Sequence, residues 1–283
     1  MIEKKVASRY QPEDPGDNDQ SDTSDNDQSP EDRAEQQADS ETQPLLDGVK
    51  EDDSAFMLSD EQPMIVRVIP VLPCLSNPSL LIALLIALVQ ATLIGSVDAT
   101  VTTVSQQLFG FDSLKAGLLF LPIGLCDLIC GPIAGWAVDR YGTKPVSVVT
   151  FIALIPIFVS LRIPHAGGMD QVVLYGALLG LVGIGLSGTG APSIVEAGAV
   201  VDRFHKVNPK FFGDSGPYAS LYGMNSMMFN AGLTVGPELA GELKEAIGYG
   251  NMNLVLAALC AVTAVLCFAY LGGKPKILHR SKS

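Results

Sequence analysis

Basic residues, histidine and cysteine are all scarce in this chain, and each shortage excludes a class of protein. Its 283 residues contain 18 lysines and arginines against 30 aspartates and glutamates, with three histidines and five cysteines. This charge balance leaves no basic surface for nucleic acid, so no nucleic-acid partner is expected. We find no nucleotide-binding glycine loop, nucleophile triad or zinc-ligand spacing. The sequence therefore predicts a protein that is not an enzyme.

The five cysteines do not form the pattern of a disulfide framework. Cys126, Cys130, Cys260 and Cys267 lie within apolar runs, and Cys74 precedes the first run. Cys126 and Cys130 could share a helix face, but no histidine or further cysteine lies near them to complete a metal shell. We predict buried free thiols, no metal site and no bound cofactor. The residues after Met1 also lack the apolar core of a cleavable signal peptide, so membrane insertion would depend on internal segments.

Negative charge is concentrated at the start of the chain. Residues 1–62 hold 19 of the 30 acids and only five bases, a net charge of −14, which leaves +2 for the remainder. This segment repeats Asp-Asn-Asp-Gln-Ser at 17–21 and 25–29 and has few β-branched or aromatic residues, a composition that cannot build a packed core. We predict a disordered acidic cytoplasmic segment over 1–75, a membrane domain over 76–273 and a basic cytoplasmic tail over 274–283.

A short sorting pattern lies inside the acidic segment. Glu41 is followed by three residues and then by Leu45 and Leu46. This arrangement is similar to the acidic dileucine signals that adaptor proteins read on endosomal and vacuolar cargo. The alternative is a solvated linker that contains two leucines.

Six apolar runs follow, each near the length of about 20 residues that a helix needs to span a bilayer. They are predicted near 79–104, 114–138, 146–163, 171–200, 216–241 and 252–271. The third run is short and the fourth is long. Short polar breaks separate the runs, as expected for neighbouring antiparallel helices. The sequence therefore predicts an all-α membrane protein with six transmembrane helices.

The distribution of lysine and arginine among the short loops predicts the orientation. Ten of these residues fall on one side of the predicted membrane, and three fall on the other, each close to a helix end. The first group is Arg67, Arg140, Lys144, Arg203, Lys206, Lys210, Lys274, Lys276, Arg280 and Lys282, and the second is Lys115, Arg162 and Lys244. We therefore expect both termini to be cytoplasmic.

The loop after the second run carries a spaced motif, G-x-x-x-D-R-x-G-x-K, formed by Gly135, Asp139, Arg140, Gly142 and Lys144. Glycine permits a tight turn, and the two cations can anchor to anionic headgroups or to a neighbouring acid. The motif resembles the cytoplasmic loop signature of the major facilitator superfamily. That resemblance implies a transporter half of six helices, with the motif acting as a conformational latch. The alternative is an ordinary positively charged cytoplasmic loop.

The fifth run contains a glycine-proline motif made of Gly232, Gly236, Pro237 and Gly241. Serial glycines let a partner helix approach closely, and proline frees a carbonyl and bends the helix. The motif is similar to one found in antiporter branches of the superfamily, although Ala240 stands where a glycine is usual. Small-residue packing without a gating role is the alternative interpretation.

The last helices resemble those of vesicular amine transporters and the drug:proton antiporter branch. The residues that carry the resemblance are the run 216–226, which reads Gly-Pro-Tyr-Ala-Ser-Leu-Tyr-Gly-Met-Asn-Ser, and the run 192–202 before it. Acids that those transporters carry in these two helices fall at Gly190 and Ser226 here. The resemblance therefore implies the fold but leaves the amine specificity open.

Three acidic residues fall inside the predicted spans, where an ionised group costs about 2.5–3.5 kcal/mol and needs a cavity or a partner. They are Asp98, Asp127 and Glu196. We predict a substrate and proton pathway that includes them. The other polar residues of that pathway are Thr189 and Ser193, in a stretch that interrupts the fourth span, and Asn225, Ser226 and Asn230 of the fifth. The alternatives are acids buried between helices and a kinked fourth helix without ligand contact.

These features together predict a secondary active transporter of a small organic solute such as a drug, an amine or a metabolite. Proton-coupled antiport by alternating access is expected, with the proton gradient in place of a cofactor. The expected partners are the lipid bilayer, the solute, and either an N-terminal half or a second copy of the chain. The plasma membrane and a vacuolar or vesicular membrane both fit. The alternative function is a non-transporting six-helix protein that binds a partner membrane protein.

Overall fold

The computed structural model describes residues 71–212 and 216–272. The chain divides into two units, residues 1–52 and 53–283, and all the described residues belong to the second. The dileucine pattern at 41–46, the basic tail at 274–283 and most of the predicted acidic segment lie outside the described residues. Their structural predictions therefore stay predictions.

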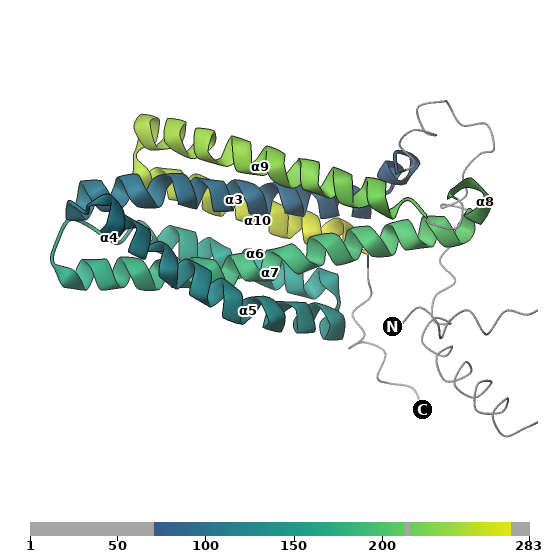
Figure 1. Ribbon diagram of the computed structural model, residues 1–283, viewed down its shortest axis with the longest axis horizontal. Coiled ribbons are helices and arrows are strands. Elements are labelled where there is room, and N and C mark those ends of the chain that lie inside the picture. Colours follow the sequence, from purple (N-terminus) through teal and green to yellow (C-terminus); the bar gives the residue numbers. More distant parts are fainter. Residues whose placement is uncertain (1–70, 213–215, 273–283) are drawn as a thin grey trace, which may run out of the picture. The chain divides into compact units, whose positions relative to one another are not determined.

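Every regular element in the described part of the chain is helical (Figure 1). Six helices are long, and a short 3-10 helix and two short α-helices accompany them. In chain order they are η4 (Pro73–Ser76), α3 (Pro78–Phe109), α4 (Ser113–Leu118), α5 (Phe120–Tyr141), α6 (Thr143–Ser160), α7 (Met169–Val207), α8 (Pro209–Phe212), α9 (Tyr218–Ile247) and α10 (Tyr249–Tyr270). The predicted all-α architecture with six long helices is confirmed.

Five of these segments are long and apolar enough to cross a membrane: α3, the segment Ser113–Tyr141 that contains α5, α6, α7 and α10. The sixth long helix, α9, has 30 residues but carries more polar side chains, including Glu238, Glu242 and Glu245. It packs closely along α3, as Figure 1 shows. A membrane crossing by α9 stays a prediction, which this packing supports.

Local chemistry sets the two ends of α3. The side chain of Asn77 caps the start, because its Oδ1 accepts a hydrogen bond from the backbone N–H of Ser79 at 2.9 Å. Pro78 occupies the first helical position, where a missing N–H costs nothing. Gly110 ends the helix in the left-handed conformation, with φ 62°, and its N–H bonds to the carbonyl of Gln106.

Single glycines make two tight turns between long helices. Gly142 alone separates α5 from α6, and Gly248 alone separates α9 from α10. Their backbone angles are nearly the same, φ 92° and ψ 166° at Gly142 and φ 83° and ψ 160° at Gly248. This region of conformational space is essentially restricted to glycine. The expectation of a tight turn at Gly142 therefore agrees with the backbone.

The segment predicted at 114–138 lies within the apolar segment Ser113–Tyr141, in which the single residue Leu119 separates α4 from α5. One prediction about helix continuity needs correction. The polar stretch 187–193 was expected to interrupt the fourth span, but α7 continues through it without a break. The hydroxyls of Ser187 and Thr189 bond back to carbonyls of their own helix, at 2.7 Å each, so they are satisfied without unwinding it.

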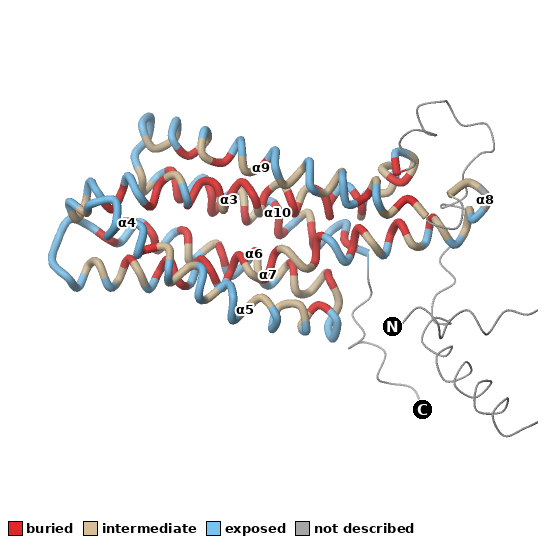
Figure 2. The backbone as a smooth tube through the Cα atoms, in the orientation of Figure 1, coloured by how far each residue is buried: buried red, intermediate tan, exposed pale blue. Residues whose placement is uncertain are grey.

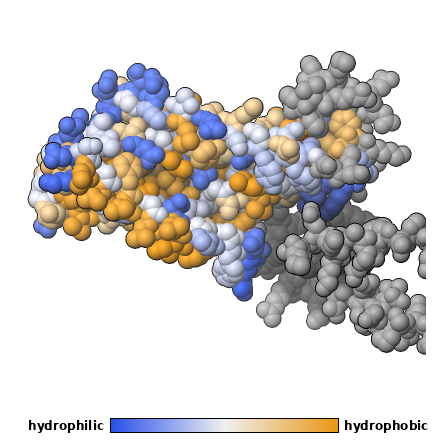
Figure 3. Space-filling view, viewed as in Figure 1, coloured by the Kyte–Doolittle hydropathy of each residue, from blue (hydrophilic) through white to orange (hydrophobic). Residues whose placement is uncertain are grey.

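Each long helix packs against particular neighbouring helices. Helix α3 lies against α9 and α7, α5 lies against α7, and α6 lies against α10 and α7. Buried residues concentrate on α3 and α7, whereas α5 is mostly exposed (Figure 2). Figure 3 shows hydrophobic side chains gathered over the middle of this face, including the region of α5. An apolar exposed surface on a long helix is what contact with lipid or another helix requires.

Residues just before α3 also pack into the helical core. Val71 and Cys74 are fully buried, in a cluster with Leu80, Phe204 and Leu221. This cluster joins the residues before α3 to α7 and α9, while the predicted domain boundaries stay predictions.

Candidate functional site

A cavity of about 150 Å³ lies between α3, α5 and α7. Nine residues line it: Gln90, Ile94, Val97, Asp98, Ile123, Gly124, Asp127, Gly183 and Leu186. Two of the three intramembrane acids of the sequence therefore face one space, although Asp98 belongs to α3 and Asp127 to α5. Two long helices that follow one another in the sequence, α3 and α5, thus each contribute a carboxylate to the cavity.

Glycines allow the cavity walls to approach each other. A Cβ atom at Gly183 would lie 2.4 Å from the carbonyl oxygen of Ile123, so α7 and α5 could not pack this closely with any other residue. A Cβ at Gly190 would lie 3.0 Å from Nε2 of Gln90. The small residues of α7 thus position both α5 and the amide of α3 at the cavity.

The cavity combines apolar walls with a few polar groups. Ile94, Val97, Ile123 and Leu186 supply hydrocarbon, and no lysine, arginine or histidine is among the lining residues. Both carboxylates are exposed in the described part of the chain, and at membrane depth an ionised group needs water, a proton or a cation beside it. The cavity can therefore accept protons or a positively charged group.

Sequence reasoning missed Gln90. It lies in the first apolar run, where its amide is the only amide between Leu80 and Leu93. An isolated amide within a predicted membrane helix is a signal that could have identified it, since such groups seek partners across helices.

The other predicted pathway residues of α7 lie at a second place. The hydroxyl of Ser193 donates to the carbonyl of Ala83 on α3 at 2.8 Å and contacts Oδ1 of Asn225 on α9 at 3.2 Å. Ser193 thus joins three helices, α3, α7 and α9. Thr189 is buried, and its hydroxyl bonds only within α7, to Leu186. Neither Ser193 nor Thr189 lines the cavity.

Glu196 is buried, with 5% of its surface exposed, and it also lies outside the cavity. The hydroxyl of Thr143, the first residue of α6, donates a hydrogen bond to Oε2 of Glu196. The positive charges of Lys144 and Arg203 act on the same carboxylate. Its surroundings are therefore those of a junction between α6 and α7, next to the signature turn. The partner Thr143 was not among the predicted site residues.

Ser226 and Asn230 of α9 are exposed and do not line the cavity. The side chain of Asn230 donates to the carbonyl of Ser226, one turn earlier in its own helix, at 2.9 Å. The structure thus divides the eight predicted pathway residues. Asp98 and Asp127 share the cavity, Ser193 and Asn225 share a contact, and the others lie apart from both.

The signature loop ends α5 and begins α6. Asp139 and Arg140 are exposed, and Gly142 makes the turn. The guanidinium of Arg140 lies 5.3 Å from the ring centroid of Trp136 and 6.0 Å from that of Tyr141. Gly135 has open space where a Cβ would stand, so no helix of the described residues uses it for close approach. The latch role stays a prediction.

The glycine-proline motif of α9 packs against α3. A Cβ at Gly232 would lie 2.3 Å from the carbonyl oxygen of Leu88, and one at Gly236 would lie 2.5 Å from that of Thr92. Pro237 contacts the other side of the interface, because a Cβ at Gly95 would lie 2.8 Å from its Cδ.

Gly241, the last residue of the motif, has open space around it. One partner in the interface was not predicted from the sequence, namely Ser96 of α3. Its hydroxyl donates to the carbonyl of Gly236 at 3.0 Å, which adds a polar contact to the close helix packing.

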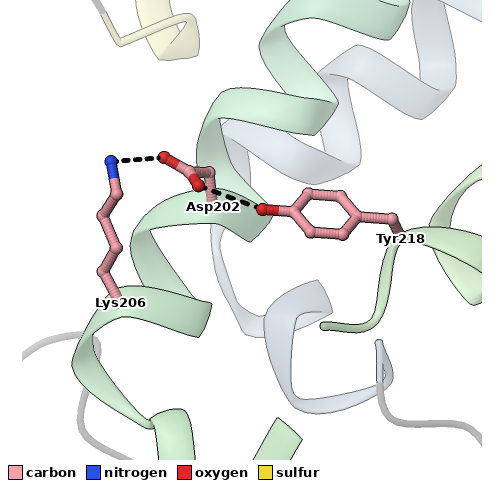
Figure 4. Close-up of polar contacts among 3 residues, drawn as sticks. All are labelled: Asp202, Lys206 and Tyr218. Atoms are coloured by element: carbon pink, nitrogen blue, oxygen red, sulfur yellow. Dashed lines mark hydrogen bonds and ion pairs between the residues drawn. The ribbon is translucent and has the colours of Figure 1, made fainter. Parts of the chain in front are cut away.

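Polar contacts also join the end of α7 to the start of α9 (Figure 4). Asp202 accepts a hydrogen bond from the hydroxyl of Tyr218 at 3.0 Å and forms an ion pair with Lys206 at 2.8 Å. One carboxylate therefore holds a side chain from each helix. The hydrogen bond thus joins the end of α7 to the first residue of α9.

Within residues 71–212 and 216–272, no group of three or more histidine, cysteine or acidic side chains is arranged to hold a metal ion. All five cysteines are free, and three of them, Cys74, Cys260 and Cys267, are buried. The site is therefore described by its carboxylates, its amide and its apolar walls.

The helices and the cavity define a multi-pass integral membrane protein. A family model described as the Major Facilitator Superfamily matches residues 20–207, and the chain belongs to this transporter family. Transporters of this family are generally not enzymes, in agreement with the prediction from the sequence.

Three relatives share this family name. The chain is 40% identical over 241 residues to an MFS-type transporter, ppzB, of Metarhizium majus, which covers 84% of this chain and 53% of the relative. It is 39% identical over 231 residues to ppzB of Metarhizium rileyi, and the match covers 81% of this chain and 48% of that relative. It is 29% identical over 183 residues to an uncharacterized MFS-type transporter of Schizosaccharomyces pombe, and the match covers 64% of this chain and 41% of that relative. The chain thus spans about half the length of the curated relatives it matches.

Proposed function

We propose that this chain forms one half of a secondary active transporter that exchanges a small organic solute for protons by alternating access. The observation that carries the proposal is the pair of carboxylates, Asp98 and Asp127, on two different helices that line one cavity. A drug, an amine or a metabolite is the proposed solute class, and the drug:proton antiporter branch is the proposed branch of the family.

The chemistry of the cavity supports proton coupling. Asp98 and Asp127 are exposed beside the apolar walls of the cavity, where a proton or a cation can reach them. An ionised and unpaired carboxylate is costly in a membrane, which favours such an exchange. Two such groups on separate helices allow a solute and a proton to compete for one site. A movement of α3 relative to α5 would then change the exposure of both groups together, which is the coupling that antiport needs.

The exposed surfaces support a second half. Gly124, Asp127, Gly131 and Gly135 follow one another at helical spacing on α5, and open space surrounds the three glycines. Small residues with room around them let another helix approach closely. We propose that an N-terminal half or a second copy of the chain completes the cavity from this side. Both termini are proposed to be cytoplasmic, in the plasma membrane or in a vacuolar or vesicular membrane.

Proteoliposomes that contain the purified chain provide the test. With an acidic lumen and a trapped pH-sensitive dye, addition of the transported solute from a panel of amines, neutral drugs and organic acids should raise the luminal pH. Asp98→Asn and Asp127→Asn should abolish this response. Asp112→Asn is the matched control, because Asp112 is an exposed acid outside the cavity and makes no side-chain cap to α4.

Two results would contradict the proposal. Unchanged proton exchange in Asp98→Asn would remove that carboxylate from the mechanism. A folded and strictly monomeric chain that moves no protons with any solute would instead favour the alternative, a six-helix protein that binds a partner membrane protein. Cross-linking in the same liposomes distinguishes the monomer from the pair.

A further inference from the structure

The turn between α5 and α6 carries two cations that lie against aromatic rings. Arg140, near the end of α5, lies over the rings of Trp136 and Tyr141 at 5.3 and 6.0 Å. Lys144, near the start of α6, lies 5.3 Å from the ring of Phe268 on α10. A cation over an aromatic face keeps its N–H groups available on its outer side. The turn therefore presents positive charge held in place by rings.

Neither cation is neutralised by a direct ion pair. Across the described ranges 71–212 and 216–272, no carboxylate lies within ion-pair distance of Arg140 or Lys144. The buried carboxylate of Glu196 acts on Lys144 electrostatically and already accepts the hydroxyl of Thr143. Asp139 is exposed beside Arg140 and makes no hydrogen bond to any residue that the structure describes. The positive charges of Arg140 and Lys144 are therefore available to an anionic partner at this turn.

The surroundings show which kind of partner fits. Trp136 is 54% exposed, Tyr141 39% and Phe268 67%, so all three rings face outward next to the cations. Leu128, Ile129 and Ile133 are exposed on α5 within about three and a half turns before Arg140. The surface thus changes along one helix from hydrocarbon to amphipathic rings and then to positive charge. This order matches a bilayer leaflet, in which tryptophan and tyrosine lie at the headgroup level.

We propose that this surface, formed by Trp136, Arg140, Tyr141, Lys144 and Phe268, binds the headgroups of acidic phospholipids in the adjacent leaflet. The rings lie at the level of the glycerol backbone, and the two cations contact the phosphate and carboxylate groups of the lipid. Binding anchors the α5–α6 turn at the membrane surface. It does not depend on the transport activity proposed above.

The chain offers its own reporter for this contact, because Trp136 is its only tryptophan. The full chain is reconstituted in phosphatidylcholine vesicles that contain some phosphatidylserine, and either lipid is supplied in brominated form. Bromine quenches tryptophan fluorescence only at close range. Brominated phosphatidylserine should quench Trp136 more strongly than its mole fraction accounts for, with an affinity advantage of roughly fivefold per cation that is lost at high salt.

Variants connect the preference to the two cations. Arg140→Gln and Lys144→Gln together should bring phosphatidylserine to parity with phosphatidylcholine, and Arg140→Lys should retain most of the preference. Lys115→Gln is the matched control, since Lys115 lies 6.0 Å from the ring of Phe111 in a similar arrangement on a different connection. Its preference should equal that of the unmodified chain. Circular dichroism verifies that each variant keeps its helices.

Three outcomes would overturn the proposal. Equal quenching by the two brominated lipids in the unmodified chain would show that the surface does not select acidic lipid. A preference that survives in the double variant would assign it to other residues. An absence of quenching by both lipids would show that protein covers Trp136, which would make the surface an interface with a second copy or another chain.

Discussion

The hydroxyl of Thr143 donates a hydrogen bond to the buried carboxylate of Glu196. Thr143 follows Gly142 directly, and Glu196 lies in the second half of α7. The signature turn is therefore attached to α7 by a side chain that the signature itself does not include. This contact gives the intramembrane acid a structural partner and separates its role from that of Asp98 and Asp127.

Removal of the hydroxyl by Thr143→Val should destabilise the protein by roughly 1–3 kcal/mol, because a buried carboxylate loses one of its two hydrogen-bond donors, the other being the backbone of Gly272. The midpoint of unfolding in a dodecyl sulfate titration measures the effect. Ser147→Ala is the control, since the hydroxyl of Ser147 is buried one turn later and bonds only to the carbonyl of Thr143 in its own helix. If Glu196→Gln and Thr143→Val prove fully additive, the two side chains do not interact.

Helix packing at the glycines of α9 leads to a second prediction. Gly232→Ala should destabilise the protein by roughly 1–3 kcal/mol, because the new Cβ would lie 2.3 Å from the carbonyl of Leu88 and the helices must separate. Gly241→Ala should be neutral or stabilising, since nothing lies within 4 Å of that position. Thermal unfolding in detergent compares the two variants. Equal melting temperatures would contradict the close packing of α3 and α9.

The turn glycine provides a third prediction. Gly142→Ala should cost roughly 1–3 kcal/mol, because alanine is strained at φ 92° and ψ 166° although the space is open. Gly248→Ala should lower the stability by a similar amount, since the φ and ψ angles of Gly248 are nearly those of Gly142. Gly117→Ala is the control, because Gly117 is helical and surrounded by open space. A wild-type melting temperature for Gly142→Ala would mean that the turn adopts another backbone conformation.

Cys74 should resist thiol reagents in the folded protein. Burial raises the pKa of the Cys74 thiol to about 12, so at pH 8 roughly one thiol in ten thousand is ionised, and the thiolate is the reactive form. Peptide mass spectrometry after maleimide treatment should detect little adduct at Cys74 until the protein is unfolded. Ser113→Cys, at an exposed position, should react readily. Comparable labelling of both sites at pH 8 would refute the buried position of η4.

The long helices could be predicted from the sequence because each needs an apolar run. The run at 171–200 indicated α7, but the helix extends to 169–207, since a helix can continue with polar residues beyond the apolar part. Gly142 indicated a tight turn after the second run, and the structure has that turn at positive φ. Hydropathy could not show that the single residue Leu119 separates α4 from α5 inside an apolar segment.

Contacts between helices could not be predicted in the same way. The sequence indicated that Gly232 and Gly236 meet a helix, yet small residues do not specify which helix, and the partner is α3. Asp98 and Asp127 were selected as costly charges, but their common cavity depends on how α3 and α5 both pack near α7. Gln90 and Thr143 were missed because each acquires its role from a residue distant in the sequence.

The one-residue turns at Gly142 and Gly248 have a mechanical consequence. Each joins two helices that find their main neighbours elsewhere, since α5 packs on α7 while α6 packs on α10, and α9 packs on α3. A one-residue turn is too short to absorb a displacement, so movement of one helix is passed on to the next helix. A push on α5 from outside the chain is therefore delivered to α6 and α10, whereas the longer connections at 110–112 and 161–168 can absorb motion. The two glycine turns therefore act as rigid connections between helices, and the longer loops act as flexible ones.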